Sequence, residues 1–357
     1  MSHTPDRPSP YLSLSHIRHR FGEREVLKNI TLEIANGEVI CLAGPSGCGK
    51  STLLRLIAGL EQLQAGELQI RQQTIASAKG QLLPEQRSIG MVFQDFALFP
   101  HLTIVDNVAF GLGHLSRTER RQRALAMLER VGLASRAKDY PHHLSGGQQQ
   151  RIALARALAP EPHILLLDEP FSNLDVRLRH HIRQQTLALL KATGTTSILV
   201  THDPDEAMFM ADRIALMFDG HILQTGSPEQ LYRHPANAFA AEFLGDVNHL
   251  QGEVTSGTVD TPFGKLPAPE LPEGSRVQIL IRPEALKPAL FAPHLEQQLA
   301  AQVQEVHMLG ANTSVVLQTA TELLMMQVNN DVQLGAGDAL QIALDPRGAF
   351  IFPEAPG

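Results

Sequence analysis

Residues 44–51 restrict the fold of this chain more than any other segment, because they read Gly-Pro-Ser-Gly-Cys-Gly-Lys-Ser. This segment fits the pattern G-x-x-x-x-G-K-S/T, whose glycines let backbone N–H groups wrap around a phosphate. A continuous apolar run at residues 39–43 precedes the loop, and an amphipathic helical pattern follows it at residues 53–60. A buried strand, a glycine-rich loop and a helix in this order predict a phosphate-binding α/β fold rather than an ordinary turn.

The positions of this loop have separate expected roles. Lys50 would reach the β- and γ-phosphates of a nucleotide, and the Ser51 hydroxyl would hold Mg²⁺. Cys48 lies at the start of the following helix, where a thiolate is favoured, so we expect a reactive thiol unless it is buried. The predicted nucleotide-binding positions in this segment are Gly44, Pro45, Ser46, Gly47, Cys48, Gly49, Lys50, Ser51 and Thr52.

Strand and helix patterns alternate after the phosphate loop, which indicates an α/β domain with a largely parallel sheet. Residues 12–43 read as strands joined by turns, and Asn36-Gly37 within that stretch is a hairpin turn signal. The expected helices are residues 117–132, 146–159 and 176–193, and the expected short strands are residues 164–167, 198–200 and 214–218.

The pattern of the sequence changes near residue 245. Beyond this point turns rich in Gly and Pro separate β-type segments, which are residues 277–281, 303–306, 314–317 and 340–343. We therefore expect a small all-β domain of the OB type at residues 246–357. The preceding regions are predicted to be a flexible tail (1–10) and a nucleotide-binding domain (11–245) with a helical subdomain at about 95–160.

Residues 164–169 form an apolar strand that ends in two acids, Asp168 and Glu169. Taken alone, the pattern fits a strand with solvated acids at its end equally well. Together with a phosphate loop it has a chemical interpretation, since Asp168 would bind Mg²⁺ directly or through water. Glu169 is then a candidate to position or deprotonate the attacking water.

A second glycine motif, Leu-Ser-Gly-Gly-Gln at residues 144–148, precedes a helical pattern. Ser145, Gly146, Gly147 and Gln148 would form another anion site at a helix start. One nucleotide does not need two such sites from the same chain. A head-to-tail homodimer, in which each copy lends this loop to the nucleotide of the other, explains the duplication better than a simple helix cap.

From about residue 12 to residue 240 the chain resembles the nucleotide-binding subunits of ABC transporters, which are phosphate-loop NTPases with a helical subdomain. In that family residues 144–148 correspond to the signature motif. The resemblance implies that Gln94 senses Mg²⁺ and the transmembrane partner, and that His202 contacts the γ-phosphate. It also implies that Asp175 belongs to the loop that joins the two sites across the dimer.

The resemblance assigns a further role to Phe21, which stands where the family has an aromatic residue, often tyrosine, that stacks on adenine. Phe21 could equally be a core residue. The predicted catalytic residues are thus Glu169, His202 and Gln94, and the predicted metal ligands are Ser51, Gln94 and Asp168.

Two further segments resemble importer subunits within this family. Phe96, Leu98 and Phe99 lie in a stretch that packs on a short cytoplasmic helix of the permease in those proteins, although core packing is the alternative for each residue. The C-terminal region resembles the TOBE-type β-barrel of importer ATPases, with residues 280–284 and 344–347 as landmarks.

Composition argues against several other classes. A formal net charge of -7 argues against a nucleic-acid partner. The two cysteines give neither a disulfide framework nor a zinc pattern. No signal sequence and no run of about 18 apolar residues is present, so we expect a peripheral subunit. Its expected location is the cytoplasmic side of the inner (plasma) membrane, where it attaches through the permease.

These observations predict an ATPase that uses ATP and Mg²⁺ and drives an importer as a homodimer on two permease domains, with a periplasmic or surface substrate-binding protein as an indirect partner. Ferric-ion uptake is favoured by residues 263–267, 280–284 and 350–353, and polyamine, sulfate, molybdate and sugar uptake are the alternatives. Other classes of function are a soluble ABC ATPase acting on ribosomes or DNA and a non-hydrolysing regulatory cassette. The presence of Glu169 and His202 speaks against the last of these.

Overall fold

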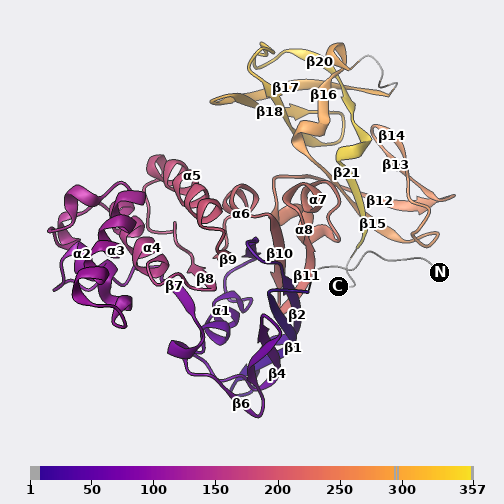
Figure 1. The fold of residues 1–357 in the computed structure, drawn as a ribbon. Helices are drawn as coiled ribbons and strands as arrows, with labels where there is room; N and C mark the ends of the chain where they lie inside the picture. Colours follow the sequence, from indigo (N-terminus) through magenta and orange to yellow (C-terminus); the bar gives the residue numbers. More distant parts are fainter. Residues whose placement is uncertain (1–8, 293–294, 296, 355–357) are drawn as a thin grey trace, which may run out of the picture. The chain divides into compact units, whose positions relative to one another are not determined.

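The computed structural model describes residues 9–292, 295 and 297–354 (Figure 1). By its internal contacts the chain divides into two units, Met1–Pro228 and Glu229–Gly357. The tail predicted at residues 1–10 lies outside the described residues except for its last two.

A six-stranded sheet forms the centre of the first unit, in the order β11-β10-β3-β9-β8-β7. All neighbouring strands pair in parallel except β10 and β11, so the prediction of a largely parallel sheet is confirmed. The middle strand β3 is buried at every residue, as expected where both faces of a parallel sheet are covered. The strands are β3 (Val39–Ala43), β7 (Ile89–Val92), β8 (Ile164–Asp168), β9 (Thr196–Thr201), β10 (Arg213–Phe218) and β11 (His221–Gly226).

A second, antiparallel sheet in this unit has the order β2-β1-β4-β5-β6. Its strands are β1 (Leu12–Phe21), β2 (Arg24–Ile34), β4 (Ala65–Ile70), β5 (Gln73–Ser77) and β6 (Gly80–Gln81). The hairpin predicted at Asn36-Gly37 is therefore wrong, because β2 and β3 belong to different sheets. Gly37 does adopt a positive φ of 73°, but its N–H donates to Thr196 Oγ1 at 2.9 Å, so the turn leads the chain from one sheet into the other.

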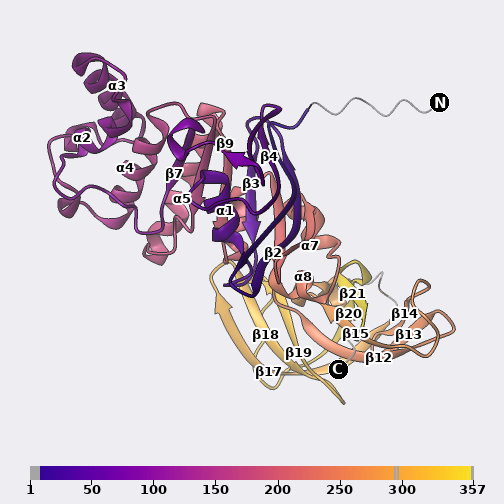
Figure 2. The same ribbon diagram turned by 90° about the horizontal axis from the view of Figure 1, so that it is seen from below.

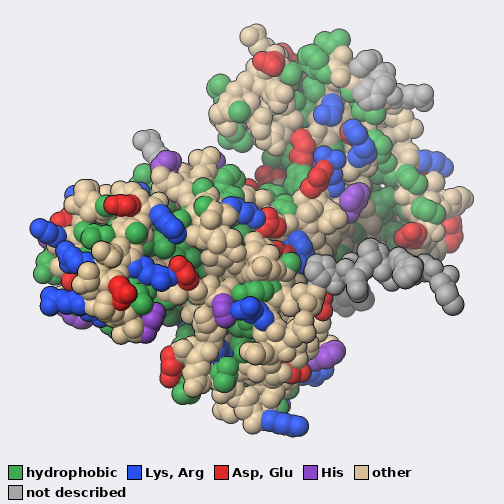
Figure 3. All heavy atoms as spheres, viewed as in Figure 1, with side chains coloured by type: hydrophobic (Ala, Val, Ile, Leu, Met, Phe, Trp, Pro, Cys, Tyr) green, Lys and Arg blue, Asp and Glu red, His purple; other side chains and the backbone are tan. Residues whose placement is uncertain are grey.

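The helices of the first unit are α1 (Lys50–Ala58), α2 (Ile104–Ala109), α3 (Arg117–Arg130), α4 (Gly146–Leu158), α5 (Val176–Thr193) and α6 (Pro204–Met210). The bounds of α1, α3, α4 and α5 lie within three residues of the predicted ones, whereas α2 and α6 were not predicted. The ribbon views show α2, α3 and α4 together as a helical group, with β7 lying between α4 and α1 in both (Figures 1 and 2). Figure 3 shows acidic and basic side chains interspersed over this group on the face drawn.

The second unit contains two five-stranded antiparallel sheets, in the orders β14-β13-β12-β15-β21 and β16-β20-β17-β18-β19, which share one apolar core. The strands are β12 (Asn248–Thr255), β13 (Thr258–Thr261), β14 (Gly264–Pro267), β15 (Arg276–Ile281), β16 (Leu286–Pro288), β17 (Gln298–Leu309), β18 (Asn312–Gln318), β19 (Leu323–Asn329), β20 (Ala339–Leu344) and β21 (Ala349–Pro353). The four strands predicted in this region are present, and the all-β prediction for it is confirmed.

The contact division begins the second unit earlier than the predicted boundary at residue 246, because it includes α8 (Ala238–Phe243) and most of α7 (Pro228–Arg233). Arg282, which is 2% exposed, accounts for this difference. Its guanidinium donates to the carbonyls of Ala241 and Gly245, both at 2.8 Å, and lies 4.2 Å from the Tyr232 ring centroid. A single buried arginine of the β domain therefore anchors both helices to it.

None of the helices in the part of the chain that the structure describes is long and apolar enough to cross a membrane.

Candidate functional site

The phosphate loop is held in its conformation by glycines that no other residue could replace without strain. Gly44 has a φ of 148°, and a Cβ placed on it would lie 2.1 Å from the carbonyl oxygen of Met217. Gly49 has a φ of 107°, and its Cβ would lie 2.9 Å from the carbonyl oxygen of Val26. The loop therefore lies tightly against β10 and β2, and α1 begins directly after it at Lys50.

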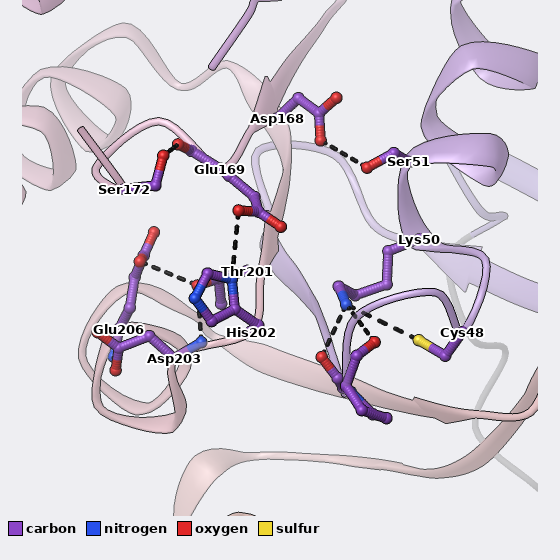
Figure 4. Close-up of polar contacts among 12 residues, drawn as sticks. Cys48, Lys50, Ser51, Asp168, Glu169, Ser172, Thr201, His202, Asp203 and Glu206 are labelled. Atoms are coloured by element: carbon purple, nitrogen blue, oxygen red, sulfur yellow. Dashed lines mark hydrogen bonds and ion pairs between the residues drawn. The ribbon is translucent and has the colours of Figure 1, made fainter. Parts of the chain in front are cut away.

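The Lys50 ammonium is directed back into this loop. Its Nζ donates to the carbonyl oxygens of Gly44 at 2.7 Å and Pro45 at 2.9 Å, and it lies 3.8 Å from Cys48 Sγ (Figure 4). The side chain is buried among these acceptors rather than extended into solvent. A cation fixed beside a ring of backbone N–H groups is suited to binding a phosphate.

The expectation of a reactive thiolate at Cys48 is not supported by this geometry. Only 5% of Cys48 is exposed, and burial raises the pKa of its thiol even though Lys50 acts in the opposite direction. The helix N-terminus is present as predicted, but desolvation of the charged form outweighs it. The alternative of a buried, unreactive thiol fits the structure better.

Ser51 and Asp168 meet at the ends of α1 and β8. The Ser51 hydroxyl donates to Asp168 Oδ1 at 2.9 Å. Burial, together with repulsion from Glu169, raises the pKa of Asp168, while the hydrogen bond from Ser51 opposes that shift. A half-buried carboxylate beside a hydroxyl provides oxygen ligands of the kind Mg²⁺ prefers, and a divalent cation would stabilise its charged form.

Glu169 and His202 face one another across the same edge of the sheet. His202 Nδ1 lies 3.2 Å from Glu169 Oε2. The backbone of Glu169 has a positive φ of 44°, and its N–H donates to the Val200 carbonyl at 3.0 Å. This turn directs the carboxylate towards the open side of the site, where the His202 ring is half exposed (Figure 4).

Gln94 joins this edge through the neighbouring strand. Val92 of β7 pairs with Leu167 of β8. Gln94 lies two residues after Val92, and Glu169 lies two residues after Leu167, so both residues follow their strands at the same edge of the sheet. The Gln94 carbonyl accepts from Asn173 Nδ2 at 3.0 Å. Asn173 belongs to the loop that runs from Glu169 to Asp175 and α5. This hydrogen bond therefore connects the segment of Gln94 to the loop that joins Glu169 and Asp175.

The signature segment lies elsewhere on the chain. Ser145 precedes α4, and its backbone contacts are internal to the turn. Its N–H donates to Gln148 Oε1 at 3.0 Å, and its carbonyl accepts from the Gln149 N–H at 2.9 Å. A Cβ on Gly146 would lie 3.6 Å from the Leu174 side chain, so the turn packs on the loop before α5. Ser145 and Gly146, two residues of the predicted anion site, are both exposed.

Two predictions about aromatic residues have different outcomes. Phe21 is 49% exposed and meets the buried His19 ring edge-on at 4.7 Å, so its outer face is available for stacking. Phe96 was expected to offer docking surface, but it is only 5% exposed and its carbonyl accepts from Arg156 at 3.0 Å. Core packing, the alternative, is correct for Phe96. Leu98 and Phe99 remain partly exposed.

The sequence pattern did not indicate which residues lie behind His202. Glu206 is 4% exposed and accepts a hydrogen bond from Thr201 Oγ1 at 2.9 Å, and Arg183 of α5 approaches it to 3.5 Å. The Asp-Pro-Asp-Glu order at residues 203–206 is typical of a helix start, and Asp203 does accept from the Glu206 N–H. The sequence therefore suggested a capping role for this segment, whereas the Glu206 carboxylate is buried and accepts from Thr201.

A phosphate loop on a parallel sheet, with acids and a histidine at the ends of the adjacent strands, is the arrangement of a phosphate-loop NTPase. Comparisons with known proteins narrow this class. Residues 27–172 match the family described as ABC transporter, and residues 279–352 match the TOBE domain.

Curated relatives match along most of their length. The chain is 44% identical over 314 residues to a sulfate/thiosulfate import ATP-binding protein of Chromobacterium violaceum, covering 87% of this chain and 84% of that protein. It is 39% identical over 352 residues to an Fe(3+) ions import ATP-binding protein of Escherichia coli O157:H7, covering 97% and 98%.

A solved structure agrees with these relatives. The ATP-binding cassette MJ0796, in a dimeric post-hydrolysis state bound to ADP and Pi, is 38% identical with a TM-score of 0.53, covering 61% of this chain and 98% of that one. The chain belongs to the ATP-binding subunits of ABC transporters that carry a C-terminal TOBE domain, and it is an ABC-type ATPase.

Proposed function

We propose that this chain binds ATP and Mg²⁺, hydrolyses ATP as a head-to-tail homodimer and thereby powers solute import through a membrane permease. The observation that carries the proposal is the convergence of four strand ends. The loop that contains Lys50 follows β3, and His202 follows β9. Asp168 is the last residue of β8 and Glu169 follows it, while Gln94 lies two residues beyond β7.

For ATP binding, we assign the phosphates to residues 44–52 and the adenine to the exposed face of Phe21. Lys50 would exchange its contacts with the Gly44 and Pro45 carbonyls for contacts with phosphate oxygens. Such an exchange replaces neutral acceptors by charged ones, which form stronger hydrogen bonds.

For Mg²⁺, the assigned ligands are Ser51, Asp168 and Gln94. Within the described ranges no group of three or more His, Cys, Asp and Glu side chains is arranged to hold a metal ion. The proposed site instead combines Ser51 and Asp168, whose oxygens lie 2.9 Å apart, with the phosphates. Bound there, the ion would neutralise charge on the transferred phosphoryl group.

For hydrolysis, we assign Glu169 the task of orienting water and accepting its proton. His202 would contact the γ-phosphate, and its 3.2 Å contact with Glu169 would keep both groups on one side of the site. Gln94 would respond to the metal and the permease through the loop that contains Asn173.

For assembly, we assign Ser145, Gly146, Gly147 and Gln148 to the nucleotide of a second copy, with Asp175 beside the junction. The exposed turn before α4 supports this assignment, and so does the dimeric state of the similar cassette. The chain would lie on the cytoplasmic side of the membrane, attached to two permease domains. A substrate-binding protein on the other side of the membrane would deliver cargo to the permease and would not contact this chain.

The assignment of Glu169 predicts the behaviour of Glu169→Gln. The amide keeps the shape of the side chain but cannot accept a proton, so turnover should fall by ~10²-fold or more while ATP still binds. A steady-state ATPase assay and an ATP-binding assay measure the two quantities. Glu85→Gln, an exposed acid on the same unit, is the matched control and should retain full activity. Near-normal hydrolysis by Glu169→Gln would remove Glu169 from this role.

The head-to-tail arrangement predicts where a disulfide can form. Ser46 and Ser145 are exposed in the phosphate loop and the signature turn, so we replace both by cysteine in a Cys48→Ala background. Oxidation with ATP present should then yield a covalent dimer on a non-reducing gel. Mixing the two single variants should give the same product, and neither alone should. A crosslink confined to one chain would contradict the arrangement.

The cargo is proposed to be ferric ion, with sulfate as the second candidate because the similar proteins carry both names. A deletion strain should lose uptake of labelled ferric ion supplied in chelated form and keep uptake of labelled sulfate. Restoring the intact gene, but not a Lys50→Ala version, should restore uptake. The reverse pattern, with sulfate uptake lost and iron uptake kept, would overturn the iron assignment and leave the ATPase assignment intact.

A further inference from the structure

Four charged side chains behind His202 form a network of ion pairs and hydrogen bonds. Two are arginines of α5, Arg179 and Arg183, and two are the acids Asp203 and Glu206 at the start of α6. Figure 4 shows Asp203 and Glu206 beside His202, on the segment that follows it. We call these four residues the His-loop network.

Arg183 is the centre of the network. One of its terminal nitrogens lies 2.6 Å from Asp203 Oδ2 and 3.5 Å from Glu206 Oε2. The same guanidinium lies 5.9 Å from the ring centroid of Phe171, two residues after Glu169. With 8% of Arg183 and 4% of Glu206 exposed, solvent weakens these contacts little.

Thr201 connects Glu206 to the backbone on both sides of His202. Its hydroxyl donates to Glu206 Oε2 at 2.9 Å and accepts from the Asp203 N–H at 3.0 Å. The residues immediately before and after His202 are therefore fixed through one hydroxyl, and Glu206 fixes the direction of that hydroxyl.

Arg179 extends the network to the loop before α5. It donates to the Leu174 carbonyl at 3.3 Å and lies 3.8 Å from Asp203 Oδ2. Leu174 precedes Asp175, so the same carboxylate is linked to the His202 loop and to the loop assigned to the dimer junction.

We propose that Glu206 is a positioning residue, which orients the loop of His202 through Thr201 and couples it to the Asp175 loop through Arg183, Asp203 and Arg179. This inference rests on the proposed function, since it assigns Glu206 a part in ATP hydrolysis. It concerns a residue that is not among those assigned to the nucleotide or to the metal.

The charge balance of the network makes the coupling depend on pH. Burial raises the pKa of Glu206 to about 7, against the hydrogen bond from Thr201 and attraction to Arg183. Burial also opposes the ionisation of Asp203, but the Glu206 N–H and Arg183 outweigh it and lower the pKa of Asp203. From β3 the group that faces Glu206 is Cys41, whose buried thiol has a pKa well above its ordinary value and stays neutral.

Above pH 7, then, two carboxylates balance two guanidiniums, and Glu206 holds both Arg183 and Thr201. Below pH 7 Glu206 gains a proton and its ion pair with Arg183 is lost. The kcat for ATP should therefore include a component that rises with pH around a midpoint near 7. Stability changes in the opposite sense. The folded pKa is raised, so ionising Glu206 destabilises the fold as pH rises from about 4.5 towards 7.

The test measures kcat and KM for ATP with the full-length chain between pH 6 and pH 8.5. Glu206→Ala should lower kcat about tenfold at pH 8, with KM for ATP nearly unchanged, because no contact with ATP is lost. Glu206→Gln keeps an acceptor for Thr201, so it should fold, but the pH-dependent component near 7 should be absent. Asp205→Asn, an exposed acid-to-amide change on the same helix, should retain the profile of the unmodified chain.

Thermal unfolding gives a second readout. Relative to the unmodified chain, Glu206→Gln should be more stable at pH 8 than at pH 5, because only the unmodified chain carries the buried charge at pH 8. A Gln variant with an unchanged kcat profile and an unchanged pH dependence of stability would overturn the inference. Full hydrolysis by both Lys50→Ala and Glu169→Gln would instead mean that the proposed function is wrong.

Discussion

The register of the parallel sheet is the constraint on which the rest of this structure depends. Ala43 of β3 pairs with Thr201 of β9, and Val200 of β9 pairs with Asp168 of β8. The phosphate loop begins directly after Ala43, and the His202 loop begins directly after Thr201. The acidic pair begins with Asp168 itself, at the end of β8. Because parallel strands share one carboxyl edge, three segments that are spread over more than 150 residues of the sequence, from Gly44 to His202, meet at one place. A register shift of one strand would separate the groups whose contacts define the site.

This geometry explains why part of the candidate site could be predicted from the sequence. An all-apolar strand such as β3 or β8 is recognised from its composition, and the polar residue after it must lie at the sheet edge. Lys50, Ser51, Asp168 and Glu169 could therefore be predicted from local pattern, whereas the expected roles of Gln94, His202 and Phe21 came from the resemblance to a family. The signature turn was also found, but its exposed position agrees with a role that needs a second chain.

What the sequence could not reveal depends on burial and on distant contacts. The helix start at Cys48 suggests a thiolate, yet the tight packing of the loop raises the thiol pKa. Asn36-Gly37 carries the composition of a hairpin, but its strands belong to different sheets. Glu206 reads as part of a helix cap, and only its contact with Thr201 and Arg183 reveals its position behind His202. Likewise, Arg282 anchors two helices that precede it by some forty to fifty residues.

The central claim is that Lys50 and the phosphate loop form a nucleotide site, and calorimetric titration of the full-length chain with ATP tests it most directly. With Mg²⁺ present, Lys50→Ala should weaken ATP binding by about 100-fold, the loss expected from about 3 kcal/mol of charge-assisted contacts. Lys79→Ala, which removes an exposed lysine, should bind ATP as the unmodified chain does. Equal affinity of the Lys50→Ala variant and the unmodified chain would contradict the account.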